Sequence, residues 1–245
     1  MPALSAGFVK CGALLKTGVF DPLEIPVLRP DPVRSIPIST RSITGQLGDQ
    51  QFESALERDL LMQLAWDDDV EWFAAQPVAI KYERDGEPRR YTPDILVKFK
   101  DCLSGTPTLL LCEVKYRREL AKHWRELRHK FRAAQAYCAE KGWRFAVFDE
   151  HEIRTARLEN IKFLWRYRNT EHSQEIAADL LQELKRRGVS TRPHLFAAIA
   201  NNFTDTEKAH AIWTWWVLVA CGVVSFDDSV RLTEATLFSL PGGGA

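Results

Sequence analysis

Two short apolar runs that carry charged residues constrain this chain more than any other feature. The first is YTPDILV (residues 91–97) and the second is LLCEVK (residues 110–115). Their composition predicts neighbouring buried strands. Burying a charge costs much free energy unless the charge is paired or holds a metal. Asp94, Glu113 and Lys115 are therefore expected either to pair with one another or to surround a cation.

The spacing of these residues favours a metal site. Glu113 and Lys115 lie two residues apart, so both side chains point to one face of a strand. If the strands pair, the carboxylates of Asp94 and Glu113 converge, and the Val114 carbonyl can add a third oxygen. Mg²⁺ prefers such sparse oxygen sites, completed by water and phosphate. The pattern indicates phosphodiester cleavage, in which Lys115 positions or deprotonates the attacking water or stabilises the transition-state charge.

The alternative to a metal site is an ion-pair network between two strands, because isolated Asp…Glu-x-Lys matches occur by chance. The flanking apolar residues favour the nuclease interpretation. An acidic residue on the preceding helix can complete the site, but the residues alone do not rank Glu53, Glu57 and Asp59.

Local charge has to carry any contact with DNA, because the 33 basic and 33 acidic residues give zero net charge. The segment 115–132 holds eight Lys or Arg against two Glu and begins at Lys115. Cations beside a phosphodiester site suit the DNA backbone, although a charged helix face is also common on surfaces. The candidate DNA-binding residues are Lys115, Arg117, Arg118, Lys122, Arg125 and Arg128.

The order of predicted elements indicates a mixed α/β sheet with flanking helices. We expect a helix over 52–66, strands over 78–82, 91–99 and 108–115, a helix over 119–141 that stops at Gly142, and a strand over 144–149. Helices follow over 173–187, 194–201 and 205–221, with a hairpin over 223–232, which together resemble a winged helix. The predicted domains are an extended arm (1–48), a catalytic domain (49–167), a helical domain (168–240) and a flexible tail (241–245).

Composition also bears on location. The five cysteines form no CxxC pair, which is typical of reduced thiols in the cytoplasm. No secretion signal is expected at the N-terminus. The most apolar window, residues 212–224, is shorter than the roughly 20 residues that a membrane-spanning helix needs. The tryptophans are expected to pack mostly in the core.

The motifs resemble a known family. The Asp94…Glu113-x-Lys115 core resembles the PD-(D/E)xK, or restriction-endonuclease-like, fold. More narrowly, the chain is similar to TnsA, the endonuclease subunit of heteromeric cut-and-paste transposases. The matching segments are Leu56-Glu57, LAW (64–66), VEWFAAQP (70–77), TPDILV (92–97), EVK (113–115), FDEHEI (148–153) and NIKFL (160–164).

The resemblance implies an Mg²⁺-dependent nuclease, for which Mn²⁺ substitutes, that nicks the 5′ strands at the ends of a transposon. It implies a DDE transposase, TnsB, and an AAA+ ATPase, TnsC, as partners, the latter through the C-terminal domain. It also selects Glu57 as the helix glutamate, beside Asp94, Glu113 and Lys115. Some members carry Gln at the position of Glu113. A stand-alone restriction or repair nuclease and a non-catalytic DNA-binding adaptor are the alternatives.

Overall fold

The computed structural model describes residues 45–47, 50–52, 54–100, 108–168, 170–200 and 203–242. The chain divides into two compact units, one ending at Glu150 and the other beginning at His151. The boundary predicted between residues 167 and 168 falls within the second unit. Apart from residues 45–47, the predicted N-terminal arm lies outside the described residues, and so does the end of the predicted tail from residue 243.

The first unit combines one four-stranded sheet with two long helices. Its described strands are β1 (Gly45–Leu47), β2 (Gln50–Phe52), β3 (Val70–Ala75), β4 (Ile80–Arg84), β5 (Glu87–Tyr91), β6 (Ile95–Phe99), β7 (Leu109–Val114) and β8 (Arg144–Phe148). Its helices are α1 (Ala55–Trp66) and α2 (Arg117–Lys141), and the short α3 (Glu150–Ile153) spans the division between the units.

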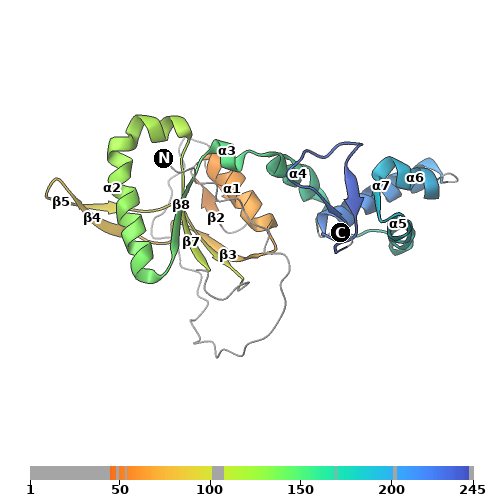
Figure 1. The fold of residues 1–245 in the computed structure, drawn as a ribbon, viewed down its shortest axis with the longest axis horizontal. Coiled ribbons are helices and arrows are strands. Elements are labelled where there is room, and N and C mark those ends of the chain that lie inside the picture. Colours follow the sequence, from red (N-terminus) through yellow and green to blue (C-terminus); the bar gives the residue numbers. More distant parts are fainter. Residues whose placement is uncertain are drawn as a thin grey trace, which may run out of the picture. The chain divides into compact units, whose positions relative to one another are not determined.

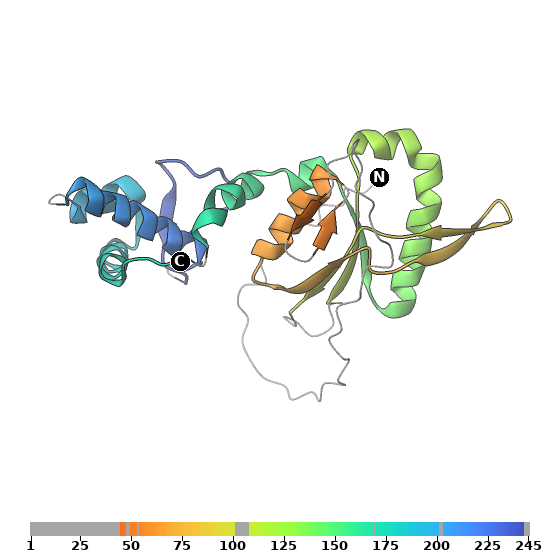
Figure 2. The ribbon, with the colours of Figure 1, turned by 180° about the vertical axis from the view of Figure 1, so that it is seen from behind.

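The four-stranded sheet has the order β3-β6-β7-β8. β6 is antiparallel to both β3 and β7, whereas β7 and β8 are parallel. The helices α1 and α2 lie on opposite sides of this sheet (Figures 1 and 2). The prediction of a mixed α/β fold is confirmed, and the arrangement is consistent with a restriction-endonuclease-like fold.

The register of β6 and β7 confirms that the two charged runs are neighbours. Ile95 lies opposite Cys112, and the backbone N–H of Asp94 donates to the Cys112 carbonyl at 3.1 Å. Asp94, the residue just before β6, therefore lies beside Glu113 near the end of β7.

Helix capping and apolar spacing explain where the two helices form. α1 begins after Ser54, whose hydroxyl accepts a hydrogen bond from the Glu57 N–H at 3.1 Å. α2 buries Leu127, Phe131, Ala134 and Cys138 against the sheet at helical spacing. It ends at Gly142, whose φ of 68° lies in the left-handed region.

The structure differs from the expected strands at two places. The strand predicted over 91–99 is two elements: β5 pairs with β4 in a separate hairpin, and β6 begins only at Ile95. Pro93 explains the break, because it has no N–H to continue a ladder. β3 was not predicted, since its sequence VEWFAA does not alternate clearly between apolar and polar residues.

The second unit is mainly helical. It contains α4 (Ala156–Leu164), a 3-10 turn (Trp165–Tyr167), α5 (Gln174–Arg187), β9 (Val189–Thr191), α6 (Arg192–Ile199), α7 (Asp205–Ala220), β10 (Ser225–Phe226) and β11 (Leu237–Ser239). The three strands form a small antiparallel sheet in the order β10-β11-β9. The hairpin predicted within 223–232 instead joins β10 to β11 through the longer segment 227–236. The helices α5, α6 and α7 correspond to the three that were predicted, and the winged-helix assignment stays a prediction.

The most apolar helix, α7, packs within the second unit. Trp215 is fully buried and contacts Phe238 with ring centroids 5.0 Å apart. Among the helices of the described residues, none is both long and apolar enough to span a membrane.

Candidate active site

Asp94 is held in place by the neighbouring strand. Its Oδ2 accepts a hydrogen bond from the Val114 N–H at 2.7 Å. Its own carbonyl accepts one from the Gln76 N–H at 2.7 Å. Asp94 precedes β6 by one residue, and these two hydrogen bonds hold it beside the end of β7.

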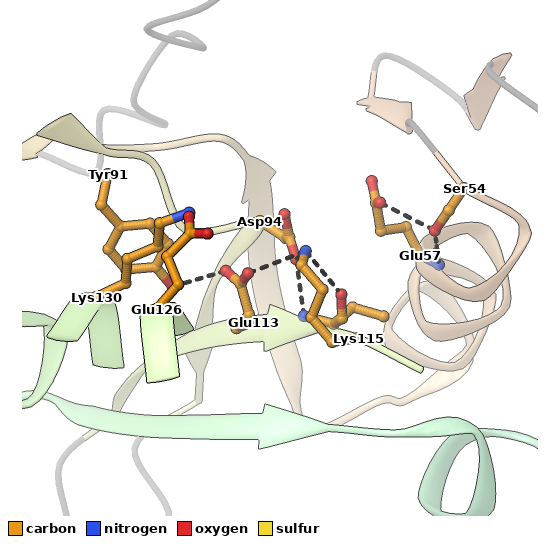
Figure 3. Close-up of polar contacts among 9 residues, drawn as sticks. Ser54, Glu57, Tyr91, Asp94, Glu113, Lys115, Glu126 and Lys130 are labelled. Atoms are coloured by element: carbon orange, nitrogen blue, oxygen red, sulfur yellow. Dashed lines mark hydrogen bonds and ion pairs between the residues drawn. The ribbon is translucent and has the colours of Figure 1, made fainter. Parts of the chain in front are cut away.

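Three oxygen atoms surround the ammonium of Lys115 (Figure 3). Its Nζ lies 2.9 Å from Oε1 of Glu113, 3.1 Å from the Val114 carbonyl and 3.4 Å from Oδ2 of Asp94. These three oxygens belong to the three groups that the sequence predicts as metal ligands. The structure thus brings the predicted ligands together around one positive charge.

Glu113 is the most deeply buried charged group of this cluster, with 3% of its surface exposed. Its Oε2 accepts a hydrogen bond from the Tyr91 hydroxyl at 2.6 Å. Burial and the nearby charge of Asp94 raise the pKa of Glu113 to about 7, against the opposing effects of Lys115 and Tyr91. A cation brought to this carboxylate would favour its ionised form.

Without a bound metal, the surroundings of Lys115 favour its protonated form. Burial lowers the pKa of its ammonium, but the charges of Asp94 and Glu113 outweigh burial and raise it well above its ordinary value. A lysine in this state is a poor general base. Of the roles expected from the sequence, positioning and charge stabilisation fit this structure better than deprotonation of water.

Glu57 lies on the first turn of α1, and Figure 3 places it on the opposite side of Asp94 and Lys115 from Tyr91. Its Oε1 accepts a hydrogen bond from the Ser54 hydroxyl at 2.9 Å. Its charge also helps to raise the pKa of Lys115. Of the other two acidic candidates, Glu53 lies outside the described residues, and Asp59 is buried and ion-paired with Arg58. The choice of Glu57 stays a prediction.

The predicted DNA-binding residues follow Lys115 along α2. Arg118, Lys122, Arg125 and Arg128 are exposed. Arg117 is exposed as well, but its Nε donates to Oδ2 of the buried Asp149 at 2.9 Å, which ties the start of α2 to the end of β8. α2 departs from helical geometry at His123, so its first turns and its longer part run in different directions.

The structure adds two residues to which the sequence assigned no role. The sequence gives no signal for Tyr91 beyond its position three residues before Asp94. Its contact with Glu113 joins strands of different sheets. Gln76 is buried and adopts φ of 48°, which is uncommon for a residue other than glycine. Such backbone strain persists where the surrounding structure requires it and often marks functional sites.

The donor set is typical of a magnesium site and not of a metal site in which the protein supplies every ligand. Within the described part of the chain, no three His, Cys, Asp or Glu side chains are grouped so that they could hold a metal. Asp94, Glu113 and the Val114 carbonyl instead supply two carboxylates and one neutral oxygen. Mg²⁺ commonly takes one or two carboxylates and completes its shell with water and substrate phosphate.

One known family is similar to the part of the chain that contains this site. Residues 67–150 match the family model described as TnsA-like endonuclease N terminal. This part of the chain is similar to the endonuclease domain of the TnsA type, and the match supports the resemblance that the motifs indicated. The match includes Asp94, Glu113 and Lys115 but not Glu57. A comparison with curated proteins finds no match to the chain.

Proposed function

We propose that this protein is the metal-dependent endonuclease subunit of a heteromeric transposase and cleaves the 5′ strands at transposon ends. The observation that carries the proposal is the convergence of Asp94, Glu113 and the Val114 carbonyl on the ammonium of Lys115. The family match of residues 67–150 supports a nuclease that acts on DNA within a transposition system.

In this proposal Asp94, Glu113 and Val114 hold Mg²⁺, or Mn²⁺ in its place. When bound by these groups, the ion would supply Lewis-acid chemistry, polarising the scissile phosphate and lowering the pKa of a water. Lys115 stays protonated and stabilises the negative charge that develops on the phosphate. Glu57 orients the attacking water from the side of α1.

The chain's own residues prepare this site. The Val114 N–H holds one oxygen of Asp94, and the Tyr91 hydroxyl holds one oxygen of Glu113. The exposed cations of α2 lead away from Lys115 and bind the DNA backbone in this proposal. A DDE transposase of the TnsB type and an ATPase of the TnsC type are the proposed partners.

The test is strand-specific cleavage of a duplex that carries the element's end. The protein is mixed with the DDE transposase of the same element and with Mg²⁺, and both strands are labelled. The wild type is expected to nick the 5′ strand, while Asp94→Asn and Lys115→Ala do not and still bind the transposase.

Other outcomes separate the alternatives. Cleavage by the protein alone would favour a stand-alone restriction or repair nuclease. Full cleavage by Asp94→Asn would exclude this metal site and favour a non-catalytic DNA-binding adaptor.

A further inference from the structure

The β4–β5 hairpin carries basic residues that the candidate site does not use. It forms a two-stranded sheet of its own and projects beyond the four-stranded sheet, beside the long part of α2 (Figures 1 and 2). Lys81 on β4 and Arg89 and Arg90 on β5 are all exposed. Among the described residues none of these three cations forms an ion pair with a carboxylate, unlike Arg84, which pairs with Asp85.

The register of the hairpin places two of these cations directly opposite each other. Lys81 pairs with Arg90, and directly opposed residues of antiparallel strands share one face. Like charges in such a position destabilise a sheet. An anion bound between them would remove this repulsion, so the pair is suited to a phosphate group.

The opposite face of the hairpin explains why it holds a fixed position. Ile80 and Tyr91 form the next pair along the ladder, and both are buried in a cluster with Ala134 and Cys138 of α2. The Tyr91 hydroxyl is also bonded to Glu113. The cation pair is therefore anchored to the candidate site through the residue that follows Arg90.

Arg90 and Asp94 are close in the sequence, so one DNA segment can contact both the cation pair and the candidate site. Asp94 follows Arg90 by four positions in the chain, so their Cα atoms lie at most about 14 Å apart. One turn of B-DNA is about 34 Å long. A duplex held at Asp94 is therefore long enough to extend to Lys81 and Arg90.

We propose that the β4–β5 hairpin is a DNA-contacting element, in which Lys81 and Arg90 bind backbone phosphates of the duplex held at the candidate active site. This inference rests on the proposed nuclease function and adds a contact separate from the basic residues of α2. Duplex DNA is the partner because it presents closely spaced phosphates to the face that carries the opposed cations.

The test measures, by fluorescence anisotropy, how salt weakens the binding of a short labelled duplex. The parent protein is the full chain carrying Asp94→Asn, and EDTA is present. Lys81→Gln combined with Arg90→Gln should reduce the slope of log affinity against log salt by about 2, because each phosphate contact contributes about 0.9. Between 50 and 200 mM salt, the double variant should therefore lose roughly tenfold less affinity than its parent.

Two controls are matched to this variant. Lys81→Arg with Arg90→Lys keeps both charges and should keep the parent's slope. Lys141→Gln with Arg144→Gln also removes two cations, one at the end of α2 and one at the start of β8, three residues before the partner of Glu113. This control should leave the slope unchanged.

The outcomes distinguish the hairpin from the proposed function. Suppose that the parent binds the duplex. If the salt slope of the hairpin variant then equals that of the parent, or equals that of the Lys141 and Arg144 control, the hairpin proposal is overturned and the nuclease proposal stands. Phosphate contacts are strong at low salt, of about 50 mM. If the parent does not bind the duplex under this condition, both proposals fail.

Discussion

The two oxygens of the Glu113 carboxylate have different partners: Oε2 accepts a 2.6 Å hydrogen bond from the Tyr91 hydroxyl, and Oε1 lies 2.9 Å from Nζ of Lys115. Tyr91 is the last residue of β5, whereas Glu113 belongs to the four-stranded sheet. The hairpin therefore fixes the orientation of a carboxylate that we propose as a metal ligand, and leaves its other oxygen directed toward Lys115.

Replacing Tyr91 with Phe should weaken metal binding without unfolding the protein. The ring remains in the core while Glu113 loses its hydrogen bond, and loss of such a supporting bond typically lowers metal affinity or activity about 10- to 100-fold. Calorimetric titration with Mn²⁺ measures the change. Tyr137→Phe is the control, because Tyr137 packs against Trp143. Equal Mn²⁺ affinities of Tyr91→Phe and wild type would show that Tyr91 only fills space.

Lys115→Ala should lower the rate of cleavage at least about 100-fold, which is the usual effect of removing one group that stabilises transition-state charge. Lys115→Arg should retain measurable cleavage, because arginine keeps the positive charge and cannot act as a base. Single-turnover cleavage in the reconstituted transposase gives both rates. If Lys115→Arg proves as inactive as Lys115→Ala, charge stabilisation is not the role of this residue.

The metal-free protein should become less stable as pH rises from about 5 to about 8. The pKa of Glu113 is raised from 4.5 in the unfolded chain to about 7 in the folded one, so its contribution is fully present below pH 4.5 and is lost as pH rises through 7. One pKa unit corresponds to about 1.4 kcal/mol, and we expect a loss on the order of 2 kcal/mol. Urea unfolding in EDTA should show this change in wild type but not in Glu113→Gln, and parallel curves for the two proteins would refute it.

Reversing the charge of Arg118 and Arg125 should weaken duplex binding and leave the melting temperature unchanged, because both side chains are exposed. Reversing Arg117 should lower the melting temperature as well, since it replaces the 2.9 Å ion pair with the buried Asp149 by two like charges. Anisotropy and thermal unfolding separate the two effects. Unaltered DNA affinity and salt dependence in Arg118→Glu with Arg125→Glu would exclude this part of α2 as a DNA contact.

The sequence predicts the centre of the candidate site because local rules determine it. Alternation along a strand places Glu113 and Lys115 on one face, and the cost of buried charge requires that Asp94 lie near them. These rules act over a few residues or between adjacent strands. The sequence predicts that the two runs are neighbouring strands, and the pairing of β6 with β7 agrees with this prediction.

The sequence does not predict contacts that depend on tertiary geometry. Tyr91 reaches Glu113 because a hairpin of one sheet folds against another, and no spacing in the chain encodes that approach. β3 was missed because its burial comes from its position beside β6 rather than from alternation. In the second unit, β11 pairs with both β10 and β9, and such pairing between distant segments leaves little signal in short windows.

The most direct test of the account is calorimetric titration of Mn²⁺ into the protein with a short DNA duplex, wild type beside Asp94→Asn. Asp94 and Glu113 provide the two carboxylates of the proposed site, so wild type should show saturable binding that disappears in Asp94→Asn while both proteins keep the same melting temperature in EDTA. Equal Mn²⁺ binding by the two proteins, or none by wild type, would contradict the metal site and leave Asp94, Glu113 and Lys115 as an ion-pair network.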